Sequence, residues 1–207
     1  MRIGLNLLHL HEGIGGVWNY VENLIFALGE LDKQNTYIVF VTRHSQCLVP
    51  GQKNFQKIII NINPLKSWQR ILYENTILHY NGWKHKLDCF HWFANVVSPF
   101  LIVPGLVTIH DLLPLRKPGS YSRIKQLYLK ISLNITARKA KSILPISHAT
   151  ALDIIQILKP RTDKIHVLPV IINDTFRPAQ GNEIKEFKNK YQLPGKFWLY
   201  VANFLAP

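Results

Sequence analysis

Acidic residues are scarce in this chain of 207 residues, which has 12 aspartates and glutamates against 25 lysines and arginines. The formal net charge is +13 at pH 7. An excess of this size favours anionic partners such as phosphates, nucleic acid or an acidic lipid surface. The imbalance is concentrated, because the segment between Asp111 and Asp153 holds no acidic residue but eight lysines and arginines.

Cysteines are also few. The two that are present, Cys47 and Cys89, make neither a disulfide framework nor a metal-ligand spacing. We expect both to be reduced thiols in the core of a cytosolic protein. No other cluster of residues has the spacing of a metal site, so we expect no metal and no cofactor.

Long hydrophobic runs are missing as well. The longest, Phe93–Ile109, is interrupted by Asn95, two prolines and Gly105, so it does not have the composition of a membrane span. The apolar segment before His9 is too short for a secretion signal. We therefore expect a cytoplasmic protein, with peripheral contact at the inner face of a membrane as an open alternative.

What the chain does have is a regular alternation of apolar runs and helical patterns. Helical spacing predicts helices at residues 17–31, 65–85, 121–141, 147–160 and 183–191. Strands are predicted at residues 2–8, 36–42, 55–61, 87–93, 105–109, 142–147, 164–168 and 197–203. This order predicts an α/β fold with a doubly wound, mostly parallel, Rossmann-like sheet.

Two stretches are candidates for a functional site. The predicted strand 105–109 delivers His110 and Asp111 at its carboxyl end, where ligands bind in open α/β sheets. The alternative is a core histidine followed by an aspartate that caps a turn. The loop before the first helix contains Gly15 and Gly16, whose backbone amides could approach an anion at the helix N-terminus. Its alternative is a tight turn that needs positive φ.

The predicted helix 121–141 carries apolar residues on two separate faces and a basic seam between them. The first apolar stripe consists of Ile124, Tyr128, Ile131 and Ile135, and the second of Leu129, Leu133 and Ala140. Two such stripes predict a helix wedged between the sheet and something else. The basic seam is either a solvated edge or a contact with an anionic membrane surface.

Taken together, the motifs resemble those of the N-terminal half of GT-B retaining glycosyltransferases of family 4. The resemblance is carried, in chain order, by Gly15-Gly16, Arg70–Asn75, Thr108–Leu112, Ser147–Thr150, Lys164–Pro169 and Trp198–Val201. The chain departs from the family pattern after Pro169, where Val170-Ile171 stands in place of Asn-Gly.

This resemblance implies transfer of a sugar from a nucleotide-diphosphate donor to the hydroxyl of a glycan or a lipid-linked glycan, without a metal. It implies catalytic positions at His110 and Asp111, with His110 against the donor sugar. Donor binding would fall to Gly15 and Gly16. The acceptor would be bound by Arg70, Glu74 and Tyr128.

The resemblance also implies a domain division. Residues 1–195 would form the acceptor-side domain, and residues 196–207 the first strand of a nucleotide-sugar-binding domain that is otherwise missing, which would leave the chain inactive alone. Two alternatives stay open: one half of a split glycosyltransferase, or a basic α/β module that binds anions or nucleic acid without catalysis. Nucleic acid is the less expected partner, because no RNA- or DNA-reading motif accompanies the basic residues.

Overall fold

The computed structural model describes residues 1–12, 14–117, 119, 121–172 and 177–200. The chain divides into two compact units, Met1–Ile171 and Ile172–Pro207, each of which is described by itself. None of the helices in the described part of the chain is long and apolar enough to cross a membrane.

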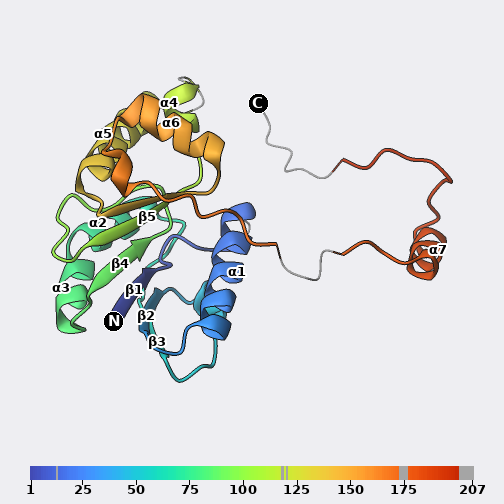
Figure 1. Cartoon of the computed structure of the whole chain (residues 1–207), viewed down its shortest axis with the longest axis horizontal. Coiled ribbons are helices and arrows are strands. Elements are labelled where there is room, and N and C mark those ends of the chain that lie inside the picture. Colours follow the sequence, from blue (N-terminus) through green and yellow to red (C-terminus); the bar gives the residue numbers. More distant parts are fainter. Residues whose placement is uncertain (13, 118, 120, 173–176, 201–207) are drawn as a thin grey trace. The chain divides into compact units, whose positions relative to one another are not determined.

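A six-stranded parallel sheet forms the centre of the first unit (Figure 1). Its strands are β1 (Arg2–Asn6), β2 (Thr36–Val41), β3 (Phe55–Ile59), β4 (Cys89–Trp92), β5 (Gly105–Ile109) and β6 (Ser142–Pro145). They lie in the order β3-β2-β1-β4-β5-β6, with Asn6 of β1 in register with Trp92 of β4. The strand order therefore reverses between β1 and β4, which is the topological switch point of a doubly wound fold. The predicted fold class is confirmed.

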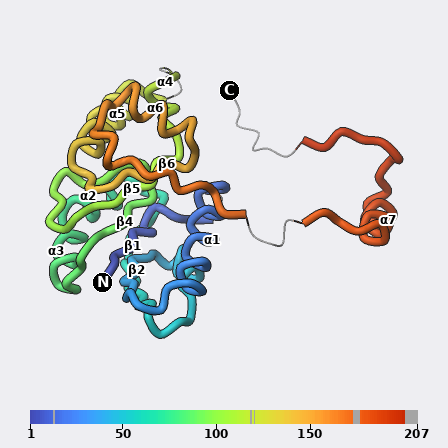
Figure 2. Tube along the Cα trace, viewed as in Figure 1, coloured from blue at the N-terminus to red at the C-terminus, as the bar shows by residue number. Residues whose placement is uncertain are grey.

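Helices cover both faces of the sheet, as the connections between parallel strands require. In unit 1 they are α1 (Gly16–Leu31), α2 (Ser67–Asn75), α3 (Ile77–Lys84), α4 (Leu113–Arg116), α5 (Arg123–Lys139) and α6 (His148–Leu158). One core cluster joins α1 to the sheet through Val21 and Ile25. The other joins α3, α5 and α6 to the opposite face through Leu78, Leu133 and Ile154. Figure 2 traces the same arrangement along the chain.

Several local predictions were wrong. The helix expected over residues 65–85 is two helices, because Thr76 between them has φ −127° and ψ −85°, outside the helical range. The stretch 164–168 is not a regular strand, although the His166 and Leu168 amides donate to carbonyls of β6. Cys89 is buried as expected, but Cys47 is exposed.

Unit 2 contains α7 (Gly181–Lys190), which begins with a capping box between Gln180 and Glu183. Arg177 donates to the Glu183 carboxylate from both of its terminal nitrogens. Residues 197–200 are not in a strand, and 201–207 lie outside the described residues. The predicted strand 197–203 is therefore wrong over residues 197–200, while the domain division at residue 195 stays a prediction.

Buried histidine makes the stability of the sheet sensitive to acid. His91 of β4 lies 2.8 Å from the Thr108 hydroxyl of β5, and burial lowers its pKa to about 3. In the unfolded chain the His91 side chain has the ordinary histidine pKa of about 6.5. As the pH falls, the unfolded state therefore takes up a proton on His91 before the folded state does. The stabilising contribution of neutral His91 is therefore complete above pH 6.5 and is lost progressively below it.

We predict that the free energy of unfolding falls by about 2 kcal/mol when the pH is lowered from 7.5 to 5, through protonation of His91 in the unfolded state alone. Urea unfolding followed by circular dichroism would measure this, with His91→Gln expected to show the shallower pH dependence. His44→Gln is the matched control, because His44 is exposed. An unchanged pH dependence in His91→Gln would show that His91 is not the titrating group.

Candidate functional site

The candidate site lies at the carboxyl ends of β1, β4 and β5, on either side of the switch point. Asn6 ends β1, and its side-chain carbonyl accepts a hydrogen bond from the Leu8 amide at 3.1 Å. Asn95 follows β4 with a φ of 63°, a left-handed conformation that asparagine tolerates better than most residues. The Asn95 side chain accepts from the His110 amide at 2.8 Å and so ties the tip of β5 to the loop after β4.

His110 is held in one orientation and one protonation state. Its Nε2 lies 3.1 Å from the Phe93 carbonyl oxygen. Because a carbonyl can only accept, Nε2 carries the hydrogen, and Nδ1 is left as an acceptor. Burial lowers the pKa of His110, against opposing effects of the Phe93 hydrogen bond and the Asp111 charge. At neutral pH this side chain is an uncharged imidazole whose Nδ1 can accept a hydrogen bond from a hydroxyl.

Asp111 has a different environment. Its side chain is exposed, and its Oδ1 accepts from the Leu113 amide at 2.9 Å, which caps the turn into α4. The carboxylate thus shapes the loop after β5 and acts on His110 through its charge. That geometry suits a positioning residue.

The glycine loop leads directly into α1. Gly15 has φ 65° and ψ −125°, which residues with a Cβ rarely adopt, and its carbonyl accepts from the Trp18 amide at 3.0 Å. Gly16 opens the helix, and a Cβ there would meet nothing within 4 Å. The Tyr20 ring, one turn along α1, meets the His110 ring edge-on with centroids 5.2 Å apart. The start of α1 and the tip of β5 are therefore neighbours.

Glu74 is a buried carboxylate at the end of α2. Its Oε1 accepts from the Asn6 amide nitrogen at 2.9 Å, and Arg70 Nε lies 3.9 Å from Oε2 without a hydrogen bond. Burial raises the pKa of Glu74, while the Arg70 charge and the Asn6 hydrogen bond oppose the rise. Oε2 therefore has a charge partner but keeps its capacity to accept from a ligand.

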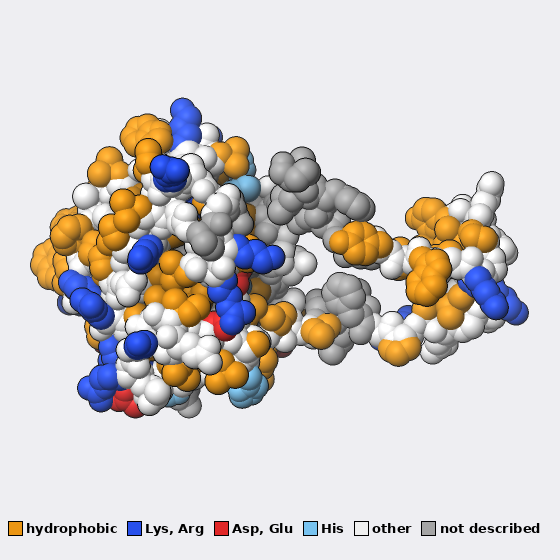
Figure 3. All heavy atoms as spheres, turned by 90° about the horizontal axis from the view of Figure 1, so that it is seen from above, with side chains coloured by type: hydrophobic (Ala, Val, Ile, Leu, Met, Phe, Trp, Pro, Cys, Tyr) orange, Lys and Arg blue, Asp and Glu red, His pale blue; other side chains and the backbone are white. Residues whose placement is uncertain are grey.

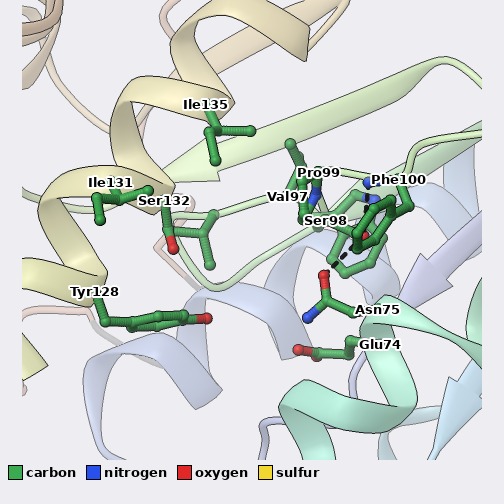
Figure 4. Close-up of a pocket in the computed structure, with 12 residues that line it drawn as sticks. Glu74, Asn75, Val97, Ser98, Pro99, Phe100, Tyr128, Ile131, Ser132 and Ile135 are labelled. Carbon is green, nitrogen blue, oxygen red and sulfur yellow. Dashed lines mark hydrogen bonds between the residues drawn. The ribbon is translucent and has the colours of Figure 1, made fainter.

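Glu74 and Tyr128 line the same cavity, which encloses about 250 Å³ between α2, α5 and the loop after β4 (Figure 4). The two side chains point toward one another across it. On one wall, Ser98 donates to Asn75 at 2.8 Å, so these polar groups are already paired. Trp92 also lines the cavity, and its buried indole nitrogen has no hydrogen-bond partner within the described part of the chain.

Mostly apolar walls with a few unpaired polar groups are typical of small-molecule sites. The cavity, called here the Glu74 pocket, offers the carboxylate of Glu74 and the phenol of Tyr128 as polar groups. This combination can accept from and donate to the hydroxyls of a sugar while the apolar walls contact its C–H groups.

His9 is a residue of this region that the sequence analysis did not single out. It is 4% exposed, and neither ring nitrogen has a hydrogen-bond partner among the described residues. Burial lowers its pKa strongly, and the charges of Arg70 and His110 add to the effect. His9 therefore lies within electrostatic reach of both Arg70, beside the Glu74 pocket, and the β5 tip. Its place after an apolar strand contained no signal that would have distinguished it from a core histidine.

The structure thus groups the predicted residues in two neighbouring sets. Arg70, Glu74 and Tyr128 belong to or adjoin the Glu74 pocket, although Arg70 does not line it. His110 and the start of α1 form the second set, and they are not among the lining residues of that pocket. The described residues include no group of three histidine, cysteine, aspartate or glutamate side chains that could hold a metal ion.

Comparison with known proteins bears on the fold. No protein-family model matches the chain, and no curated protein sequence matches it. Among solved structures, a glycosyltransferase from Rickettsia africae is 16% identical with a TM-score of 0.52, over 94% of this chain and 50% of that one. Anabaena HepE in complex with UDP-glucose is 14% identical with a TM-score of 0.59, over 93% and 50%.

An enzyme of another kind shares the fold too. UDP-GlcNAc 2-epimerase from Neisseria meningitidis, bound to UDP-GlcNAc, is 12% identical with a TM-score of 0.52, over 81% of this chain and 46% of that one. The chain spans about half the length of each of these structures. At such low identity the comparison establishes the fold: this chain has the Rossmann-like α/β fold that also occurs in glycosyltransferases of the GT-B class.

Proposed function

We propose that this chain is the acceptor-side, N-terminal domain of a retaining glycosyltransferase of family 4. The enzyme would move a sugar from a nucleotide-diphosphate donor to a hydroxyl of a glycan or a lipid-linked glycan. The observation that carries the proposal is the Glu74 pocket beside the switch point, where a buried carboxylate faces Tyr128. Such a pocket suits an acceptor sugar, and the neighbouring β5 tip suits the donor.

His110 would contact the donor sugar. A neutral imidazole with a free Nδ1 can accept a hydrogen bond from a sugar hydroxyl and hold the ring in place as positive charge develops at the anomeric carbon. The amides at the start of α1 would lie near the leaving diphosphate, because a helix N-terminus favours negative charge. Asp111 would act by positioning the loop. No metal is needed for these roles.

The alternatives are weaker. A basic nucleic-acid-binding module has no support from the structural neighbours, two of which are in complex with nucleotide sugars. The epimerase shares the fold. A pocket for an acceptor next to the donor site, which is the role proposed for the Glu74 pocket, is a requirement of a transferase. One half of a split enzyme would use the same residues in the same roles.

The acceptor site is tested by Glu74→Gln. The change keeps the shape of the side chain but removes the charge, so we expect at least a tenfold loss of affinity for the sugars that bind, since charge-assisted hydrogen bonds contribute about 1.5–3 kcal/mol. Saturation-transfer NMR with a panel of methyl glycosides would measure it. Glu22→Gln, on the exposed side of α1, is the matched control. Equal binding by Glu74→Gln would rule out the pocket as the acceptor site.

The donor site is tested by His110→Ala. Because His110 is only partly buried and makes one side-chain hydrogen bond, we expect unfolding to become easier by only about 1 kcal/mol. The imidazole NMR signals of His110 should shift when UDP-glucose is added to the wild-type chain, and the donor affinity should fall in the variant. His44→Ala is the control. Global unfolding of His110→Ala would instead identify a core histidine.

A further inference from the structure

Helix α5 presents apolar side chains on two opposite sides, and only one side is covered. Leu133 and Ala137 are buried in the core. On the other side Ile124, Leu127 and Ile131 are 85%, 60% and 52% exposed. These three, with Tyr128, are called here the α5 outer face. Three residues of the first predicted stripe, Ile124, Tyr128 and Ile131, belong to this face, and the core clusters of the described residues do not include them. The fourth, Ile135, is half-buried and lines the Glu74 pocket.

Cations flank this face at helical spacing. Arg123 precedes Leu127 by four residues, Lys130 follows it by three, and side chains at these spacings lie next to one another. Arg123 and Lys130 are exposed. No acidic residue is present from position 112 to 152, so nothing on α5 or the loops that flank it neutralises them. Figure 3 shows blue lysine and arginine side chains beside orange apolar ones over unit 1, with few red ones.

The α5 outer face places apolar side chains next to positive charges that have no counter-charge on the helix. This combination limits the kinds of partner that can cover the face. A purely apolar partner would leave the cations without counter-charges. A second copy docked by two-fold symmetry would bring the same cations together, because both sides of such an interface are the same surface. A bilayer surface supplies acyl chains for the apolar residues and phosphate groups for the cations, as it does for interfacial amphipathic helices.

We propose that the α5 outer face docks on a lipid bilayer that contains anionic phospholipids. Tyr128 and Ile131 belong to this face and also line the Glu74 pocket. Exposed Phe100 lines the pocket as well and extends the apolar rim. Docking would thus bring the pocket to the membrane surface. The idea that docking serves a lipid-linked acceptor rests on the proposed function. The docking itself can be measured without donor or acceptor.

The test is sedimentation of the 207-residue chain with vesicles of phosphatidylcholine alone and of phosphatidylcholine mixed with phosphatidylglycerol. We expect binding to the mixed vesicles to be at least about tenfold tighter than to the neutral ones. Arg123→Gln/Lys130→Gln should weaken it about tenfold, and Leu127→Ser/Ile131→Ser should weaken it by a similar factor. All four residues are exposed, so the variants should keep the circular dichroism spectrum of the wild type.

Two matched controls separate a specific face from general stickiness. Lys53→Gln/Lys57→Gln removes the same charge from exposed sites near the β3 edge, and Phe26→Ser/Leu31→Ser removes exposed apolar side chains from α1. Both should bind as the wild type does. Equal binding to neutral vesicles, or equal loss in the control variants, would overturn the proposal. The proposal would also be wrong if the chain self-associated and Leu127→Ser/Ile131→Ser abolished this self-association without weakening vesicle binding. A second copy of the chain would then cover the face.

Discussion

The reversal of strand order between β1 and β4 is the constraint on which the rest of unit 1 depends. Because all strands are parallel, the connections to either side of this point run over opposite faces of the sheet. In doubly wound sheets the loops on either side of such a point diverge, and ligands bind in the crevice that this leaves at the carboxyl ends of the strands. Asn6 and Trp92 are in register at these two strand ends, and Asn6 donates a hydrogen bond to Glu74 there.

A buried carboxylate has lost its contacts with water, and hydrogen bonds or nearby cations must compensate for that loss. Glu74 receives this compensation from one hydrogen bond and one cation, which is incomplete for a group with two oxygens. Its second oxygen, Oε2, has the Arg70 charge beside it and can still accept a hydrogen bond from a ligand. Trp92 and His9 have buried ring nitrogens without a hydrogen-bond partner among the described residues, and an unpaired buried polar atom costs about 1–3 kcal/mol. Several such groups together are better explained by a ligand than by packing.

The sequence predicted the sheet well because a parallel strand buried on both faces is a short apolar run, which is a local signal. It predicted α1 to within one residue for the same reason, since Val21 and Ile25 recur at helical spacing. The break at Thr76 and the pairing of Glu74 with Asn6 were not predictable, because the first is a backbone conformation and the second joins residues 68 positions apart. His9 could not be recognised either, because its burial depends on tertiary packing.

Helix α5 connects these features. Its inner side closes the core over the sheet through Leu133 and Ala137, while Tyr128 and Ile131 form one wall of the Glu74 pocket. A helix with one role would need only one apolar stripe, and natural surfaces usually fill the remaining positions with polar residues. The α5 outer face, with its neighbouring cations, is therefore a departure from what folding requires. Since Tyr128 and Ile131 belong both to the α5 outer face and to the wall of the Glu74 pocket, the outer face and the pocket are best understood as parts of one site.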